Sequence, residues 1–475
     1  MSEQNPHTSD LADLPAVELA GLIGRGELSA RELLAACLER VERSNGGVNA
    51  IVTLDVEGAS AAAAAADERF ARRGPDGPLH GLPMAHKDTH LTGGMRTTFG
   101  SPLMSDHVPD SDELVVARAA AAGAIRLGKT NVPEWAAGSH TVNPVFGATH
   151  NPYRPGRSAG GSSGGAAAAL ATGMVALAEG SDMGGSLRNP AAFCNVVGFR
   201  PTPGRVPTHP AQLSRQTLAV QGPMGRTVAD VALLLSVLAG PDPRAPLSLQ
   251  DPGSVFGPPL QAGVDGLRVA WAPDLGGRVP VDAAVAGVVA GAASVLEGLG
   301  ARVEPDCPDL DLADSVFTAL RAWAFLLSFG PLVDRDPDRV KATIRDNVEV
   351  GRALTVSDLG VAAQRQSALH EIVVEFFERY DVLVSPTVQV EPFDVELEYP
   401  TLVAGVRQPD YLGWMRSCTL ISATGCPAVS VPAGFTADGS PVGLQIVGAP
   451  RADRKVLQVA AAFEAATGHG RRRPV

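Results

Sequence analysis

Hydrophobic positions near the N-terminus recur with helical spacing. Residues 14–26 and 29–44 each carry an amphipathic helical pattern. The second segment opens on Ser29 with Glu32 three residues later, which is the spacing of a capping box. We therefore predict an N-terminal helical layer over residues 1–75, extended by an alanine-rich run and ended by a stretch rich in proline and glycine.

Beyond this layer, short apolar runs alternate with helical segments. The apolar runs lie at 124–128, 174–180, 267–273, 381–387, 428–434 and 442–448, and the helical segments at 111–123, 226–239, 281–299 and 452–467. This alternation is typical of a sheet with helices on both faces and predicts an α/β fold. Residues 312–380 instead carry consecutive helical patterns, so we expect them to form a helical insertion or cap.

Composition and charge narrow the class of protein. The chain has 475 residues, 45% of them hydrophobic and 19% charged, as in a globular protein rather than a disordered or fibrous one. One large α/β domain over residues 1–475 can fill that length. The net charge of −12 repels a phosphate backbone, so no nucleic-acid partner is expected.

Cysteine usage and the N-terminus indicate the compartment. The five cysteines are scattered and never have C-x-x-C spacing, which argues against a disulfide framework and a zinc site. The first residues are polar and acidic, unlike a signal peptide, and no stretch of 18 apolar residues occurs. We therefore expect a cytoplasmic protein without a membrane partner.

Two glycine-rich stretches contain serines that could carry chemistry: SAGGSSGG at 158–165 and GGS at 184–186. The first could be a flexible linker, but the apolar helical pattern after it favours a place in the core. Residues 160–164 also match the G-x-S-x-G nucleophile elbow. That elbow needs a strand leading into the serine, and NPYRPGRSA is a poor strand, so this type of hydrolase is disfavoured.

A serine without a histidine base needs another proton acceptor, and lysine is the candidate. Only four of the 39 basic residues are lysines. An arginine stays protonated in a protein, whereas burial can lower the pKa of a lysine until it acts as a base. Lys87 follows an apolar segment and suits a partly buried strand end; Lys129 is the second candidate, whereas Lys341 and Lys455 lie in exposed-looking helical contexts.

The second glycine stretch belongs to SDMGGSLRNPAAF at 181–193, with an acid, two glycines and a serine at a turn before a short helix. Glycines at such a turn let successive backbone N–H groups converge on a developing oxyanion, as acyl transfer requires.

Six ordered blocks across residues 81–450 resemble the amidase signature family. They are GLPMAHKD, GKTNVPEW, AGGSSGG, SDMGGSLRNPAAFCNVVGFRPTPGRVP, DVLVSPT and GCPAVSVPAGFTADGSPVGLQIVGAP. The resemblance implies an α/β/α sandwich around a large twisted mixed sheet. It also implies hydrolysis of amide C–N bonds by a Ser-Ser-Lys triad through an acyl-enzyme, with no metal and no cofactor.

Carried over residue by residue, the resemblance assigns the triad. Ser186 would be the nucleophile, Ser162 the bridging serine on a cis peptide bond, and Lys87 the base. Ser163 falls on a supporting position. The oxyanion would be stabilised by the backbone N–H groups of Met183, Gly184, Gly185 and Ser186. Asp182 and Arg188 flank the turn, and we expect them to hold its shape, because polar side chains beside tight turns usually bond backbone.

Two other interpretations have support in the sequence. His86, Asp88 and His90 alternate along one segment and could share a strand face as ligands of a metal hydrolase. The chain could also be the amidase-like component of a tRNA-dependent amidotransferase. Against this, the Gly-Thr-Tyr-like segment usual in that component is missing, since the region before DVLVSPT reads ALHEIVVEFFERYD.

The predicted triad identifies the substrate only as a small-molecule amide or carbamate. Amides, aryl acylamides and carbamates or urethanes all join a carbonyl to a nitrogen leaving group. We expect the pocket walls to come from loop 133–150 and the helical cap, with five aromatic candidates: Trp323, Phe325, Phe329, Tyr411 and Trp414. Such walls favour a bulky aryl or medium-chain acyl group, in a monomeric or homodimeric enzyme.

Overall fold

The computed structural model describes residues 11–260 and 263–474, and its centre is a mixed sheet of eleven strands. In sheet order these are β1 (Ile51–Leu54), β3 (Ile125–Thr130), β2 (Pro83–Lys87), β6 (Leu177–Asp182), β8 (Val220–Gly225), β7 (Val197–Arg200), β14 (Ala428–Phe435), β15 (Pro441–Gly448), β11 (Val382–Pro386), β9 (Arg268–Trp271) and β10 (Arg302–Pro305). Two short hairpins lie outside it, β4 (Val142–Asn143) with β5 (Gly147–Ala148) and β12 (Leu402–Val403) with β13 (Val406–Arg407). The predicted α/β fold is confirmed.

Strand directions place the chemistry at one edge of the sheet. Strand β2 runs parallel to both β3 and β6, so their carboxyl ends meet on the same side. Strand β8 pairs antiparallel with β6 and β7, and β14 pairs antiparallel with β7 and β15. Lys87 ends β2 and Asp182 ends β6, so the two motifs that carry them come together although they lie far apart in sequence.

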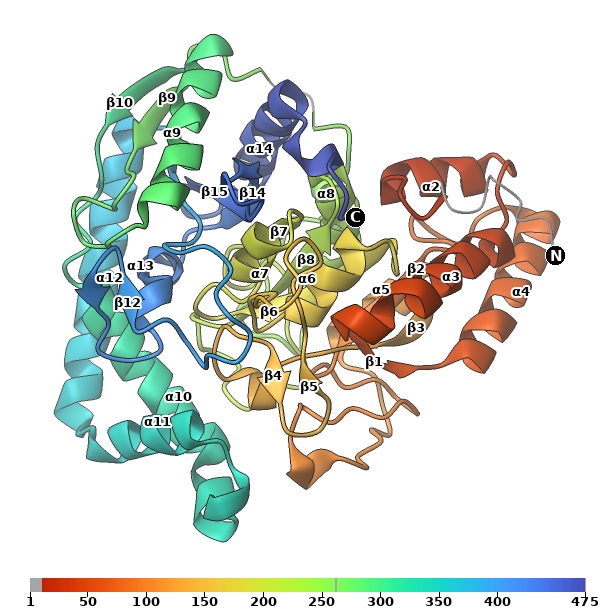
Figure 1. Cartoon of the computed structure of the whole chain (residues 1–475), viewed down its shortest axis with the longest axis horizontal. Helices are drawn as coiled ribbons and strands as arrows, with labels where there is room; N and C mark the ends of the chain where they lie inside the picture. The colour runs from red at the N-terminus through yellow and green to blue at the C-terminus, as the bar shows by residue number, and fades with distance from the viewer. Residues whose placement is uncertain (1–10, 261–262, 475) are drawn as a thin grey trace.

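Helices cover both faces of the sheet (Figure 1). One face packs against α2 (Ala16–Gly24), α5 (Leu114–Ala121), α8 (Val228–Leu238), α9 (Ala283–Gly298) and α14 (Asp453–Thr467). The other face carries α6 (Gly164–Ala171), α7 (Arg188–Phe193) and α13 (Arg416–Thr424). Every residue of α6 and α7 is buried, so the helices that follow the two glycine stretches belong to the core and the linker interpretation is wrong.

The N-terminal segment forms α2, α3 (Ala30–Val48) and α4 (Val56–Arg73), at the right of Figure 1. The predicted capping box is present: Ser29 Oγ accepts from the Glu32 amide, and the Glu32 carboxylate accepts from the Ser29 amide. The segment also contains β1, which the helical pattern missed. This strand pairs antiparallel with β3 and joins the segment to the main sheet.

Residues 312–380 fold into the short 3-10 helix η4 (Pro337–Arg339) and three α-helices, as their pattern predicted. The α-helices are α10 (Ala313–Arg335), α11 (Ala342–Ala353) and α12 (Val356–Arg379), and α10 packs against α11, α12 and α13. Within the described residues, α10 is the one helix long and apolar enough to cross a membrane by length and composition. A core helix of a globular protein meets the same criteria, and α10 has its buried face against the neighbouring helices.

Candidate active site

A buried lysine and a serine are joined by a hydrogen bond at the carboxyl end of β2. Lys87 Nζ lies 2.8 Å from Ser162 Oγ and 3.0 Å from Ser181 Oγ. Ser162 stands two residues before α6, and Ser181 lies near the end of β6, the strand next to β2. The structure therefore brings together two of the three residues predicted for a triad and adds Ser181, which sequence reasoning missed.

The ammonium group of Lys87 has lost its contact with water. The side chain has no exposed surface. Burial lowers the pKa of Lys87 to about 7, against the opposing influence of the Glu179 and Asp182 carboxylates. At neutral pH a large fraction of Lys87 is therefore the free amine, which can accept a proton.

The stretch SAGGSSGG is a tightly packed turn between loop 133–150 and α6. The Gly161–Ser162 peptide bond is cis, as the resemblance implied. Ser139 Oγ donates to the Gly161 carbonyl over 2.5 Å. Gly160 has a φ of +74°, and a Cβ there would lie 2.9 Å from Pro190 Cα, so a side chain at this position would push α7 away. The glycines thus permit close approach of two backbones.

The GGS turn follows β6 and presents Ser186 to a cavity that Ser162 also lines. Gly185 has a φ of +107°, and a Cβ there would meet the Asn189 amide at 2.5 Å. Ser186 is 9% exposed. Within the described residues, no hydrogen bond joins the Ser162 and Ser186 hydroxyls, although the Ser163 amide donates to the Ser186 carbonyl over 3.2 Å.

One of the four predicted oxyanion donors has another partner. The Gly185 N–H donates to Asp182 Oδ1 over 2.9 Å, so the prediction for Gly185 is wrong in this structure. The N–H groups of Met183, Gly184 and Ser186 have no acceptor among the described residues. Three donors therefore remain for a developing oxyanion. A carboxylate beside a tight turn readily accepts a hydrogen bond from a backbone amide that faces it, and Asp182 does so from Gly185.

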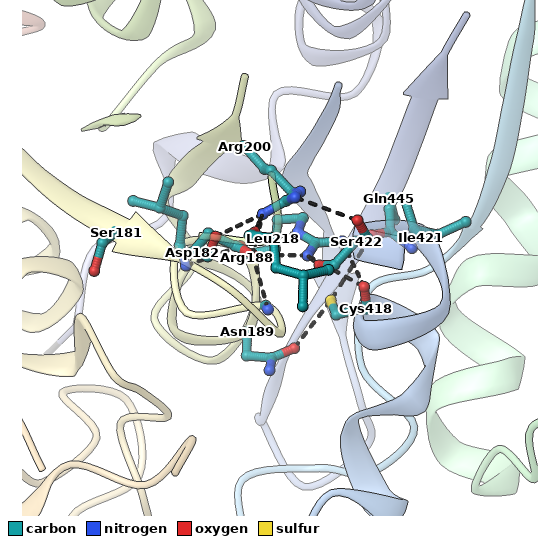
Figure 2. Close-up of polar contacts among 12 residues, drawn as sticks. Ser181, Asp182, Arg188, Asn189, Arg200, Leu218, Cys418, Ile421, Ser422 and Gln445 are labelled. Atoms are coloured by element: carbon teal, nitrogen blue, oxygen red, sulfur yellow. Dashed lines mark hydrogen bonds and ion pairs between the residues drawn. The ribbon is translucent and has the colours of Figure 1, made fainter. Parts of the chain in front are cut away.

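Asp182 holds the turn by a buried ion-pair network, shown in Figure 2. Its carboxylate accepts from the Leu187 amide, from Arg188 Nε and Nη2, and from Arg200 Nη1. Burial favours the neutral acid, but the two guanidinium groups and the Gly185 amide hold the pKa of Asp182 well below its usual range. Arg188 also donates to Gln445 Oε1 over 2.6 Å and so ties the turn to β15. Asp182 and Arg188 were expected to hold the shape of the turn, and the structure shows that they do so partly through an ion pair with each other.

Removing the Asp182 charge is expected to destabilise the fold. Asp182→Asn leaves Arg188 and Arg200 buried without their carboxylate, and breaking a buried pair costs about 3–5 kcal/mol of unfolding free energy. The measurement is urea unfolding of both proteins at pH 7. The control is Asp314→Asn, which removes the half-exposed partner of Arg416 and should cost less than about 1 kcal/mol. Equal losses for the two variants would contradict the structural role of Asp182.

The cavity at the GGS turn has a volume of about 210 Å³. Its lining includes Phe325 and Phe329 of the predicted aromatic set, from α10, and Trp135, Ala136 and Gly138 from loop 133–150. Phe317, Arg321 and Met415 also line the cavity, and Phe317 and Met415 pack close to Gly184 of the GGS turn. Loop 133–150 and the cap helix α10 therefore both contribute walls.

Three of the five predicted aromatic residues do not line this cavity. Trp414 is 1% exposed and stacks on Phe193 in the core, with ring centroids 6.0 Å apart. Trp323 lies on α10 off the cavity face, and Tyr411 stands behind Arg321, to which its hydroxyl is hydrogen-bonded. Their assignment to the pocket is corrected accordingly: neighbouring positions of a helix face different sides, and composition does not resolve which side meets the cavity.

The proposed metal ligands His86, Asp88 and His90 do not converge. The Nδ1 atoms of His86 and His90 lie 2.9 and 3.1 Å from Glu179 Oε1. Asp88 instead accepts from the Thr98 hydroxyl and amide. Across the described ranges, no group of three His, Cys, Asp or Glu residues is placed to hold a metal ion. His86 in β2 and His90 just after it instead hold the buried carboxylate of Glu179 between their imidazoles.

The other lysines have partners that keep them from the serines. Lys129 is also fully buried, and Lys129 Nζ donates to the His90 carbonyl over 2.5 Å and to Thr92 Oγ1 over 2.8 Å. Lys341 is half-buried and not exposed as predicted. Its ammonium lies 3.3 Å from the Ala137 carbonyl and 3.5 Å from Glu398. Only Lys87 contacts a serine of the cavity within the described chain.

Comparisons with known proteins agree with this geometry. The model of the amidase family matches residues 32–457. The chain is 38% identical over 469 residues to an acylamidase of Rhodococcus erythropolis, covering 98% of this chain and 97% of the relative. It is 36% identical over 497 residues to one of the subunits of the glutamyl-tRNA(Gln) amidotransferase of Moorella thermoacetica, covering 98% and 99%.

Solved structures give the same result. The crystal structure of a bacterial aryl acylamidase of the amidase signature family superposes with a TM-score of 0.89 at 29% identity, covering 97% of this chain and 99% of that one. The fold and these relatives define an enzyme that hydrolyses carbon–nitrogen bonds. Within that class, the chain belongs to the amidase signature family.

Proposed function

We propose that this enzyme hydrolyses the C–N bond of small-molecule amides through an acyl-enzyme, with Ser186 as nucleophile, Ser162 as proton bridge and Lys87 as base. The observation that carries the proposal is the 2.8 Å contact between buried Lys87 Nζ and Ser162 Oγ. It lies at a cavity that Ser186 and the GGS turn also line.

The proton relay runs from Ser186 to Lys87. The free amine of Lys87 takes the proton of Ser162, and Ser162 takes that of Ser186 as Ser186 Oγ bonds to the carbonyl carbon. The N–H groups of Met183, Gly184 and Ser186 stabilise the oxyanion, and one such donor is worth about 3–4 kcal/mol. The proton then passes to the leaving nitrogen as the C–N bond breaks. Water releases the acyl group by the reverse route.

The cavity favours an apolar acyl or aryl group. Phe317, Phe325, Phe329 and Trp135 all line the cavity, and Trp135 stacks on Phe99. The relatives named acylamidase and aryl acylamidase support substrates of this kind. Carbamates and urethanes present the same carbonyl and nitrogen and belong to the same proposed class.

A substrate panel tests the proposal. We expect p-nitroanilides of aryl and medium-chain acids to be turned over at least about tenfold more efficiently, in kcat/KM, than acetamide, because each buried methylene contributes about 0.8 kcal/mol. Hydrolysis by the chain purified alone, in the presence of a strong chelator, is the expected result. Exclusive turnover of small polar amides would contradict the apolar acyl site, and loss of activity to the chelator would favour the metal hydrolase.

A role within an amidotransferase is a second candidate, supported by the relative from Moorella thermoacetica. In that role the chain would work with partner chains and a tRNA. Amide hydrolysis by the purified chain without any partner would argue against it, whereas activity that develops only with added partner chains would favour it.

A further inference from the structure

We propose that Arg321 binds a carboxylate on the substrate, so that the preferred amides are anionic. The inference rests on the proposed function, because it assigns the substrate class of the same cavity. Arg321 lies in the middle of α10 and lines the cavity together with Ser162 and Ser186. It is 5% exposed, and it is the one positively charged residue among those lining residues.

The charge of Arg321 has no counter-ion. Within the described residues, no carboxylate oxygen lies within 4 Å of its guanidinium. Nη2 donates to the Tyr411 hydroxyl, Nη1 lies 3.6 Å from Met183 Sδ, and Nε has no acceptor. The guanidinium carbon lies 3.9 Å from the centroid of the Phe325 ring. These neighbours are neutral, and a buried cation is unfavourable until an anion pairs with it.

The other buried arginines are satisfied differently. Arg188, Arg200 and Arg205 each pair with a carboxylate, and Arg226 donates to two main-chain carbonyls. Arg226 resembles Arg321 in having no carboxylate within 4 Å and an Nε without an acceptor in the described chain, but two carbonyls accept from it. Arg321 has neither a carboxylate nor a carbonyl partner among the described residues, and it lines the cavity. This contrast indicates that its partner arrives with the ligand.

The neighbourhood of Arg321 contains more donors than acceptors. The Tyr411 oxygen accepts from Arg321 and, over 2.9 Å, from Asn347 Nδ2. The Tyr411 O–H has no acceptor among the described residues. Arg321 lines the cavity and its Nε–H has no acceptor among the described residues, which suits a carboxylate, because a carboxylate offers several acceptor positions and accepts from arginine in a bidentate manner.

The position of Arg321 limits the substrate. Its Nη1 contacts Met183, the residue directly before Gly184 of the oxyanion turn. A carbonyl at that turn and a carboxylate on Arg321 must therefore be separated by a short linker. The carboxylate could belong to the acyl part, as in the half-amide of a dicarboxylic acid, or to the amine part, as in an N-acyl aminobenzoate. Aromatic walls around the pair exclude water and strengthen the interaction.

The experiment compares matched substrates. One pair is the mono-p-nitroanilide of succinic acid against the p-nitroanilide of butyric acid; the other is N-butyryl-4-aminobenzoate against N-butyrylaniline. The wild-type enzyme should prefer the anionic member of at least one pair by about tenfold or more in kcat/KM. Arg321→Met should abolish that preference, which lowers the ratio between the two members by about tenfold or more, and Arg321→Lys should restore part of it. The pair that responds identifies the part of the substrate that carries the charge.

The control is Arg352→Met, which removes an arginine of α11 paired with Asp334 and Glu349 at the surface. The ratio between the members of each pair should not change in this variant. A purely structural role for Arg321 would lower both members equally, and this outcome would overturn the inference.

A second measurement needs no variant. Succinate or benzoate should inhibit wild-type hydrolysis of a neutral p-nitroanilide competitively, because each free carboxylate can occupy Arg321. Hydrolysis of neutral anilides without any anionic preference or carboxylate inhibition would overturn the inference and leave the proposed function standing. Absence of hydrolysis for all four substrates would overturn both.

Discussion

Ser186→Ala is expected to lower kcat by about ten-thousandfold or more on any amide that the wild-type enzyme hydrolyses. Ser186 Oγ forms the bond to the acyl carbon in the proposed reaction, and loss of a nucleophile that works as part of a catalytic unit removes the contribution of the whole unit. The fold should be retained, since the backbone of the turn is held by Asp182 and not by the Ser186 hydroxyl. The measurement is kcat, with circular dichroism to verify folding.

Covalent labelling separates the two cavity serines. A serine-directed phosphonyl fluoride should modify Ser186, as read by peptide mapping, because its hydroxyl lies next to the open oxyanion donors. Ser163→Ala is the matched control, since the Ser163 hydroxyl is buried without a partner in the described chain; this variant should be labelled as the wild type is. Modification of Ser162 instead would favour the hypothesis of a G-x-S-x-G nucleophile elbow, in which Ser162 is the nucleophile.

The strands that sequence predicted best are those with uninterrupted apolar runs. Residues 428–434 and 442–448 became β14 and β15, which are buried on both faces. Strands β7 and β8 were missed because glycine, proline and arginine interrupt them, as in VGFR and VQGPMG. Their environment explains these residues: a Cβ at Gly198 would collide with the Leu187 carbonyl. Such a requirement for close approach arises from tertiary packing and is absent from local propensity.

The sequence predicted the site residues that stand in recognisable motifs. It did not predict residues that reach the cavity from helices outside those motifs. Lys87, Ser162 and Ser186 stand in the ordered blocks, and the structure places all three at one edge of the sheet. Arg321 escaped notice because arginine is the common basic residue of this chain and α10 places it among apolar neighbours. A charged residue inside SVFTALRAWAFLLSFG was the available signal, since a cation in an apolar helix requires a partner.

Lys87→Met is expected to lower kcat/KM by several orders of magnitude and to abolish the rise of activity with pH. In the wild type, burial lowers the pKa of Lys87 to about 7 from the usual value for lysine. The neutral amine is the active form, so kcat/KM should increase about tenfold per pH unit below pH 7 and level off above it. The measurement is a profile of kcat/KM between about pH 5 and pH 9 at constant ionic strength, for both proteins.

Lys129→Met is the matched control, because burial also lowers the pKa of Lys129, to about 8. A lowered pKa is therefore not what distinguishes the two lysines; contact with a cavity serine is. Lys129 Nζ is bonded to the His90 carbonyl and Thr92, so its loss should reduce the unfolding free energy and leave kcat/KM within about tenfold, with the same pH profile. Equal losses of activity in the two variants, or a profile that keeps its rise in Lys87→Met, would assign the base to another group.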